Sequence, residues 1–368
     1  MFVTTSLFTT NLLLGLAIAF PSAVVHSRQD AAKTPCLSGP EIPMSANGNG
    51  AYPRATILQD GSILGAYTGS DGTNNILTLV SSTDSGSSWH QIGTAASRPT
   101  ISSDLDNVYP LQLASGRILL AYRNHDRNTD SLSDYTYFRI TLSYSDDNGA
   151  SWLYLSEPVS YAGSQYHGAW EPYMRLSANG TVQMYWSQEN SQIHQDLLML
   201  SSYDGGKTWA NQITVAGTDV QSRDGMIGVA PASDGTLIGI FESDDTVNTN
   251  LFTIHSVTST DDGFSWSNRQ PVYTPNGTRT NAGAPQVVNV GGTLVASFMT
   301  DEDTQAQHWA DDAASKLLTS EDGGATWSNK LEVFPPSSYW PGVLTLDDSC
   351  LLYMSSYNGV KSQVVELV

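Results

Sequence analysis

Residues 82–89 of the chain read Ser-Thr-Asp-Ser-Gly-Ser-Ser-Trp, and this segment determines how the rest of the sequence is interpreted. Its pattern, Ser/Thr-x-Asp-x-Gly-x-Ser/Thr-Trp, occurs four more times, at residues 145–152, 202–209, 259–266 and 320–327. Asp can accept hydrogen bonds from the amides of a tight turn, Gly can adopt a positive φ, and Trp can pack beneath the loop. The five segments are therefore predicted to be hairpin tips with a structural role and no catalytic one.

A second repeat alternates with the first and has six copies. Each copy is an apolar strand, a short turn and a second apolar strand that ends in an aromatic residue, with turns near residues 61, 116, 180, 235, 292 and 349. Inner hairpins at this spacing, each followed by an outer hairpin, predict an all-β fold: a six-bladed β-propeller over residues 36–368, whose closed ring leaves no long sheet edge exposed. A pair of β-sandwiches would not explain one period that runs the length of the chain.

Composition and charge exclude several classes of partner. The 368 residues carry 16 Lys and Arg against 36 Asp and Glu, a net charge of −20. Such a surface repels phosphate backbones and anionic lipid, so neither nucleic acid nor a membrane is expected as a partner. We expect a monomer.

The first residues resemble a secretion signal. An apolar run over residues 12–20 has the length of a signal-peptide core and is too short to span a bilayer. We predict a signal peptide at residues 1–23, a short segment at 24–35 and a secreted, extracellular protein. The sequons at Asn179 and Asn276 are candidate glycosylation sites.

The chain has two cysteines, Cys36 and Cys350, at opposite ends of the predicted propeller. In an oxidising compartment such a pair favours a disulfide, which would tie the start of the chain to the last blade. The alternative is two free buried thiols.

Two carboxylates occupy corresponding positions of the repeat. Propeller sites form at one rim, where the inner strands begin and the second strands end. Of the residues assigned to those positions, which include Tyr109 and Trp186, only Glu171 and Glu242 are carboxylates. Two carboxyl groups at one site are the minimum for glycoside hydrolysis, at roughly 5–5.5 Å for retention of configuration and 6.5–9.5 Å for inversion.

The neighbours in sequence suggest a role for each carboxyl group. Glu171 follows Trp170 and precedes Pro172 and Tyr173, and aromatic neighbours that dehydrate a carboxyl group raise its pKa. Glu171 is therefore predicted to be the acid and Glu242 the nucleophile, although the reverse is also compatible with the sequence. Aromatic and cationic residues at the same rim are predicted to bind substrate: Arg54, Tyr109, Arg123, Trp170, Trp186, Arg223 and Trp340. The His and Cys residues show no zinc-binding spacing, so no metal is expected.

The eight-residue repeat resembles the Asp-box of the sialidase superfamily. Within that fold, residues 170–172, 241–242 and 338–341 look like the active-site segments of family 93 glycoside hydrolases. These are fungal exo-α-1,5-L-arabinanases, which release arabinobiose from the non-reducing end of linear arabinan with retention. The resemblance implies Glu171 and Glu242 as the catalytic pair, Tyr339 beside the anomeric carbon, the arabinan side chains of pectin as substrate, and no cofactor.

Two other functions are open at this point. The first is a sialidase or another exo-glycosidase. A sialidase would need three arginines around a substrate carboxylate, for which Arg54, Arg123 and Arg223 are available, but Glu171 does not fit its pattern. A non-catalytic carbohydrate-binding propeller would keep its ligand when either Glu is replaced, and would release no sugar.

Overall fold

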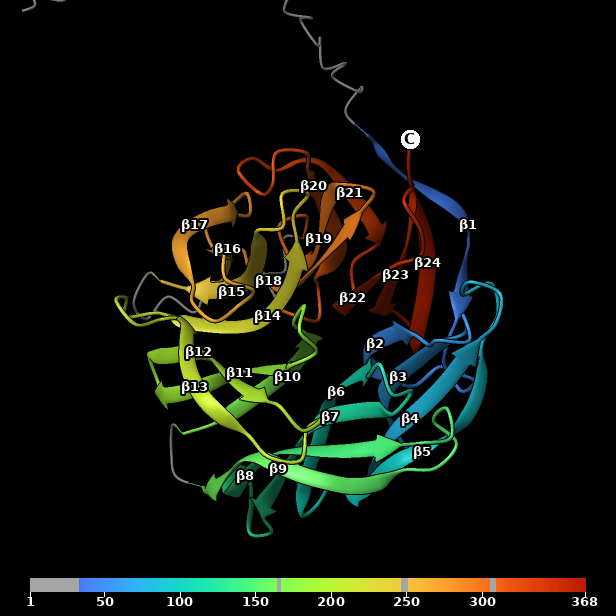
Figure 1. Cartoon of the computed structure of the whole chain (residues 1–368), viewed down its shortest axis with the longest axis vertical. Helices are drawn as coiled ribbons and strands as arrows, with labels where there is room; N and C mark the ends of the chain where they lie inside the picture. Colours follow the sequence, from blue (N-terminus) through green and yellow to red (C-terminus); the bar gives the residue numbers. More distant parts are fainter. Residues whose placement is uncertain (1–32, 164–166, 246–250, 305–308) are drawn as a thin grey trace, which may run out of the picture. The chain divides into compact units, whose positions relative to one another are not determined.

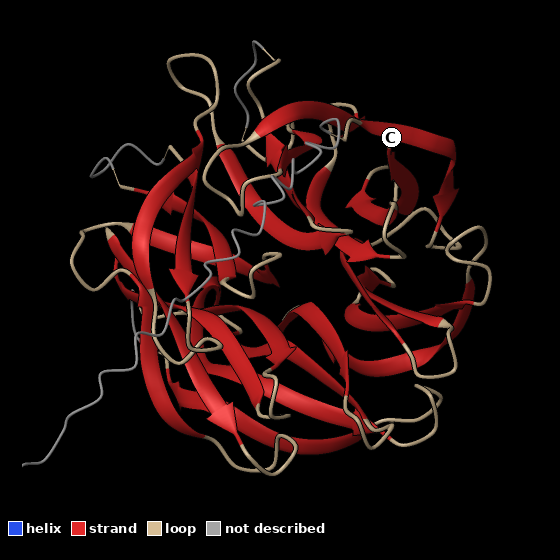
Figure 2. Cartoon of the chain, turned by 45° about the horizontal axis from the view of Figure 1, so that its top comes forward, coloured by secondary structure: helices blue, strands red, loops and turns tan. Residues whose placement is uncertain are grey.

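A computed structural model describes residues 33–163, 167–245, 251–304 and 309–368. The signal peptide predicted for residues 1–23 lies outside these ranges. Every regular element within them is a β-strand (Figure 2). None of the described residues forms a helix with the length and apolarity needed to cross a membrane.

Four of the sheets have four strands each, with every pairing antiparallel. The first contains β2 (Ala51–Ile57), β3 (Ile63–Ser70), β4 (Asn74–Ser82) and β5 (His90–Pro99). The second contains β6 (Ser103–Gln112), β7 (Ile118–Asn128), β8 (Ser131–Ser145) and β9 (Leu153–Ala162). Another contains β18 (Ala282–Val290), β19 (Thr293–Thr300), β20 (Ala314–Ser320) and β21 (Ser328–Phe334). The last contains β22 (Tyr339–Thr345), β23 (Cys350–Ser356), β24 (Val360–Leu367) and, at its outer edge, β1 (Pro35–Pro43).

The remaining sheet has eight strands. Its first half contains β10 (Ala169–Leu176), β11 (Val182–Ser191), β12 (His194–Ser202) and β13 (Ala210–Ala216). Its second half contains β14 (Arg223–Pro231), β15 (Leu237–Asp244), β16 (Thr253–Ser259) and β17 (Ser267–Tyr273). One parallel bridge, between Gln195 and Arg223, joins the halves. The structure thus has four separate four-stranded sheets and one of eight, where the sequence predicts six separate ones, because this bridge makes the third and fourth repeats continuous.

The innermost strands form a closed ring. Successive contacts join β2 to β6, β6 to β10, β10 to β14, β14 to β18 and β18 to β22, and β22 contacts β2 again (Figure 1). Apolar side chains of neighbouring sheets pack between them, as Leu64 and Leu79 of the first sheet do with Leu120 of the second. Burial of apolar surface between sheets is the main favourable contribution to such a fold. The all-β propeller class predicted from the sequence is confirmed.

The five repeated Trp segments have the predicted turn structure. In the first copy, Asp84 Oδ1 accepts the backbone N–H of Ser88 at 2.9 Å, and its Oδ2 accepts the Ser88 hydroxyl at 2.6 Å. Gly86 has φ 86°, in the left-handed region that favours glycine. The Trp89 indole donates to Ser362 Oγ of the last sheet at 3.0 Å, so this turn also links the two ends of the chain.

The predicted disulfide between Cys36 and Cys350 is wrong. Both cysteines are free, and both pair with the same residue, Glu366, from opposite sides of β24. Two strand spacings separate them, about 9.6 Å, whereas the Cα atoms of a disulfide lie at most about 6.8 Å apart. The two cysteines do share a sheet, but β24 lies between their strands. The pairing of β1 with β24, near the C-terminus, closes the ring in place of a disulfide.

Thiol titration checks this arrangement. We expect two reactive thiols per chain in denaturant without reductant, and no change in melting temperature when Cys350 is replaced by Ser. A single oxidised species that loses stability on reduction would contradict the paired positions of the two cysteines.

Candidate active site

Each innermost strand carries a β-bulge near its first residue, and the six bulges define one rim of the ring, called here the bulge rim. At each bulge a residue other than glycine adopts positive φ: Tyr52, Asn107, Glu171, Met226, Ala284 and Trp340, with φ between 46° and 57°. Bulges re-aim side chains, and they are frequent beside active sites. The residue before each bulge residue pairs with the second strand of its sheet, which defines six second-strand positions: Thr68, Arg123, Ser187, Glu242, Met299 and Ser356.

The structure corrects two of the predicted equivalences. Trp186 precedes the second-strand position, which Ser187 occupies, and a slip of one residue in a strand turns the side chain to the opposite face. Trp186 is accordingly 2% exposed and packs in the core with Met184 and Leu198. Its side chain therefore packs in the core, away from the second-strand position that the sequence analysis gave it.

Tyr109 likewise lies two residues beyond the bulge residue of its strand, Asn107. Its ring packs on that of Tyr173, with centroids 4.7 Å apart, and lines a cavity of about 300 Å³ in the channel, formed by the later parts of the inner strands. Tyr109 thus lies deeper in the channel than the bulge rim.

Glu171 and Glu242 come together at the bulge rim, Glu171 as a bulge residue and Glu242 as a second-strand residue of the next inner hairpin. Both are partly exposed. Oε2 of Glu242 accepts the backbone N–H of Ala284 at 2.7 Å. A Cβ at Gly283 would lie 2.5 Å from that oxygen, and one at Gly225 would lie 3.3 Å from Oε1. Two glycines thus leave room for the carboxyl group, and Ala284 fixes one of its oxygens.

Burial raises the pKa of both carboxyl groups, to different extents. For Glu242, burial and then the negative charge of Glu171 raise the pKa to about 7. For Glu171, burial raises the pKa, while the Arg123 guanidinium and the Ser187 hydroxyl oppose the rise. Burial and the charge of Glu171 thus favour the proton on Glu242, whereas Arg123 and Ser187 favour ionised Glu171, so these surroundings favour the reverse of the roles predicted from the sequence.

The position of the Trp170 ring explains why the roles favoured by the structure differ from those predicted from the sequence. The sequence argument assumed that this ring dehydrates Glu171, but it packs among other aromatic rings, with centroids 5.3 Å from His125, 5.6 Å from Tyr135 and 5.7 Å from Phe138. The Arg123 guanidinium lies 5.2 Å from the Trp170 ring centroid. The ring therefore borders the cation that favours ionised Glu171.

The three predicted arginines are close to the bulge rim and differ in their partners. Arg123 pairs with Asp104 at 3.0 Å and Asp106 at 3.3 Å. Arg223 pairs with Glu189 at 2.9 Å. Arg54 is 2% exposed and donates to the carbonyl oxygens of Pro53 and Trp340, and its Nε and Nη2 have no acceptor among the described residues.

Tyr339 and Trp340 are partly exposed and pack in one cluster with Tyr52, Met226 and Ala284. Trp309, which the sequence analysis missed, belongs to the same cluster and would contact a Cβ at Gly283 at 2.9 Å. Tyr339 therefore packs in the same cluster as Ala284, whose N–H holds Glu242.

Sequence reasoning also missed Ser187 and Asn107. A bulge adds one residue to a strand and so changes which of its side chains face the rim. An alignment of the repeats that allowed for this extra residue would have found both. Asn is also among the few residue types that adopt positive φ readily.

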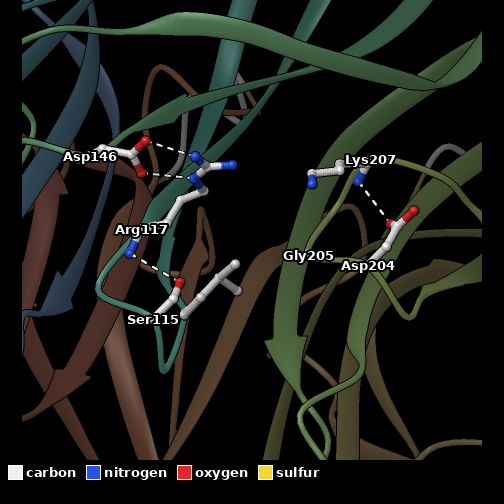
Figure 3. Close-up of a pocket in the computed structure, with 7 residues that line it drawn as sticks. Ser115, Arg117, Asp146, Asp204, Gly205 and Lys207 are labelled. Carbon is white, nitrogen blue, oxygen red and sulfur yellow. Dashed lines mark hydrogen bonds and ion pairs between the residues drawn. The ribbon is translucent and has the colours of Figure 1, made fainter.

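A pocket of about 350 Å³ lies away from the carboxylates, where the inner turn at Ser115 meets the Trp segments that contain Asp146 and Asp204 (Figure 3). Arg117 and Asp146 neutralise each other there through a bidentate pair at 2.7 Å. Asp204 is held by its own turn, through the N–H of Thr208 at 2.9 Å. No group of three His, Cys, Asp or Glu in the described ranges is arranged to hold a metal ion.

Comparison with known proteins shows the family. Residues 62–248 match the BNR repeat-like domain. The chain belongs to that family. No curated protein matches this BNR repeat-like chain in sequence.

Solved structures show the same fold as this BNR repeat-like chain. One is the family 93 α-L-arabinofuranosidase of Fusarium graminearum in complex with arabinobiose, with a TM-score of 0.67 and 20% identity over 91% of this chain and 98% of that one. Another is an α-L-arabinanase of Penicillium chrysogenum with arabinobiose, with a TM-score of 0.66 and 18% identity over the same shares. The NanB sialidase of Streptococcus pneumoniae is also similar, with a TM-score of 0.62 and 11% identity over 92% of this chain and 70% of that one.

Proposed function

We propose that this protein is a secreted, monomeric glycoside hydrolase that cleaves linear α-1,5-L-arabinan from its non-reducing end, with retention, and releases arabinobiose. The proposal treats each half of the eight-stranded sheet as one blade, so that with the four other sheets the propeller has six blades. Asn179 and Asn276 are exposed, as glycan acceptors must be.

The observation that carries the proposal is the carboxyl pair. Glu171 and Glu242 reach one rim from adjacent inner hairpins, and the charge of Glu171 helps to raise the pKa of Glu242. Two carboxyl groups that divide one proton between them have the acid and nucleophile of a retaining glycosidase. Relatives in fold that are solved with arabinobiose support arabinan as the substrate.

In the proposed mechanism, Glu242 donates its proton to the departing glycosidic oxygen and ionised Glu171 attacks the anomeric carbon. Glu242, then a carboxylate, takes a proton from the water that hydrolyses the glycosyl-enzyme ester at Glu171, which restores both groups. Tyr339, which packs in the same cluster as Ala284, lies beside the reacting carbon in this scheme.

The pH profile of kcat/KM tests the charges in the free protein. Because the pKa of Glu242 is raised to about 7, the proton donor is lost as the pH rises through about 7. Because the pKa of Glu171 is also raised above its usual value, the nucleophile is lost as the pH falls, earlier than for a solvated Glu. We expect a bell-shaped profile with its optimum on the acid side of neutrality. A profile that is flat from pH 6 to 9 would contradict this assignment of the proton.

The substrate is tested by incubation with linear α-1,5-arabinan, branched arabinan and sialyllactose, followed by chromatography of the products. We expect arabinobiose from linear arabinan and no sialic acid. Release of sialic acid alone would support the sialidase alternative, and no release from any substrate would support a non-catalytic propeller.

The arginines argue against a sialidase. In a sialidase, three arginines must be available to the substrate carboxylate. In this protein, acidic side chains already neutralise two of the three candidates, Arg123 and Arg223. The fold does not separate the two functions, because sialidases and arabinanases share it.

A further inference from the structure

A repeated hydrogen bond joins neighbouring inner hairpins at the bulge rim. The backbone N–H of a bulge residue donates to the side chain at the second-strand position of the preceding inner hairpin. Tyr52 donates to Ser356 Oγ at 3.2 Å, Met226 to Ser187 Oγ at 3.2 Å, Ala284 to Glu242 Oε2 at 2.7 Å and Trp340 to Met299 Sδ at 3.3 Å. Glu242 therefore occupies a position whose structural role recurs around the ring.

Two of the six positions, all in described parts of the chain, lack this bond. At one of them the second-strand residue before Glu171 is Arg123, whose guanidinium cannot accept a hydrogen bond. The other lies between the first and second sheets. There the expected bond runs from the N–H of Asn107 to the hydroxyl of Thr68. Asp106 intervenes, because its own Oδ1 accepts that N–H at 2.7 Å. Thr68 Oγ1 is left without a partner among the described residues, and so is Asn107 Oδ1.

Both side chains are more than nine-tenths buried, Thr68 at 9% exposed and Asn107 at 6%. Buried polar atoms in folded proteins almost always have a partner, so an exception calls for a ligand or a water molecule. The carboxylate beside them, Asp106, pairs with Arg123 at 3.3 Å, and Arg123 is on the inner hairpin directly before the one that carries Glu171, so this gap lies one hairpin away from the carboxyl pair.

The two unpartnered atoms match one kind of ligand group. A hydroxyl group can donate to the amide oxygen of Asn107 and at the same time accept the proton of the Thr68 hydroxyl. A carboxylate or phosphate cannot donate, and would be repelled by Asn107 Oδ1 and by Asp106. A neutral sugar hydroxyl has the donor and the acceptor that these two atoms lack.

We propose that Thr68 and Asn107 form a subsite that recognises one hydroxyl group of the neutral sugar bound beside Glu171. This inference rests on the proposed function and adds to it the residues that select a neutral sugar over an anionic one. A site built to hydrogen-bond a substrate hydroxyl discriminates strongly against analogues that lack it, because its own polar groups are then left unpaired.

The test measures binding of linear α-1,5-arabinotriose by calorimetry, in a Glu242→Gln background that does not hydrolyse it. Thr68→Val keeps the shape of the side chain and removes the hydroxyl, and Thr68→Ser restores it. Asn107→Gly removes the amide and keeps the positive φ. The matched control is Asn211→Gly, since Asn211 also has positive φ, 55°, but lies exposed at the start of the outer strand β13.

We expect Thr68→Val and Asn107→Gly each to weaken binding about tenfold, while Thr68→Ser and Asn211→Gly stay within about twofold of the background. Among arabinotrioses that each lack one hydroxyl group, one should bind equally to the Glu242→Gln protein with and without Asn107→Gly, because that ligand lacks the hydroxyl that the subsite recognises. If wild-type protein hydrolyses arabinan but Thr68→Val and Asn107→Gly keep full affinity, the subsite is wrong and the proposed function stands. If wild-type protein neither binds nor hydrolyses arabinotriose, both are wrong.

Discussion

Replacing Glu242 by Ala should lower the rate of arabinan hydrolysis by at least about 10³-fold, within the range expected for loss of a general acid. An aryl arabinobioside with a good leaving group needs no protonation, so its first step should be nearly unaffected. The glycosyl-enzyme should then accumulate, because the general base is missing too. Added azide should restore turnover and give a glycosyl azide of retained configuration.

Glu171→Ala is the matched variant, and its expected result differs in kind. Without the nucleophile, the first step fails with either leaving group, and any azide product has the inverted configuration because azide attacks the substrate directly. The reverse pattern in the two variants would keep the pair and restore the roles predicted from the sequence, with Glu171 as acid. Near wild-type activity of both variants on arabinan would exclude this site.

The fold was predictable because its signals are local. In the first turn, the side chains of Ser82, Asp84 and Ser88 bond to one another and to backbone N–H groups within the turn, so its geometry is set largely within eight residues. The ring then follows from repetition. The bridge between Gln195 and Arg223 that fuses two sheets depends on the approach of two separate hairpins, which no local pattern reports.

The site was predictable to within one or two residues in each strand. Glu171 is next to a proline, as are Tyr52, Ala284 and Trp340, and those positions were aligned correctly. In the second sheet the proline comes three residues after the bulge residue instead of directly after it. Alignment on the proline therefore selected Tyr109 in place of Asn107. Tertiary surroundings decide which Glu holds the proton, since Arg123 acts on Glu171 across the fold. Sequence neighbours could not reveal that.

Gly283→Ala should lower kcat/KM on arabinan by about 10²-fold, in line with the effect of misplacing a reacting group by about 1 Å. The φ of Gly283 is outside the left-handed region, so the backbone accepts a side chain there. The added methyl group would lie 2.5 Å from Glu242 Oε2 and 2.9 Å from the Trp309 ring, so it cannot move away from the carboxyl group without meeting the ring. The carboxyl group must therefore move off the Ala284 N–H, and the proton donor moves with it.

The control is Gly239→Ala, which adds a methyl group to the strand that carries Glu242. This methyl would lie 3.1 Å from both Ile227 and Trp266 and would not contact the carboxyl group. Both variants should lose some thermal stability, but only Gly283→Ala should lose activity at a temperature where each is folded. Its alkaline limb should also shift, because Glu242 loses the N–H that opposes the rise of its pKa. With that bond gone, the carboxyl group holds its proton to higher pH, so the shift is upward. Equal activity losses in the two variants would show that Gly283 is needed for packing and does not position Glu242.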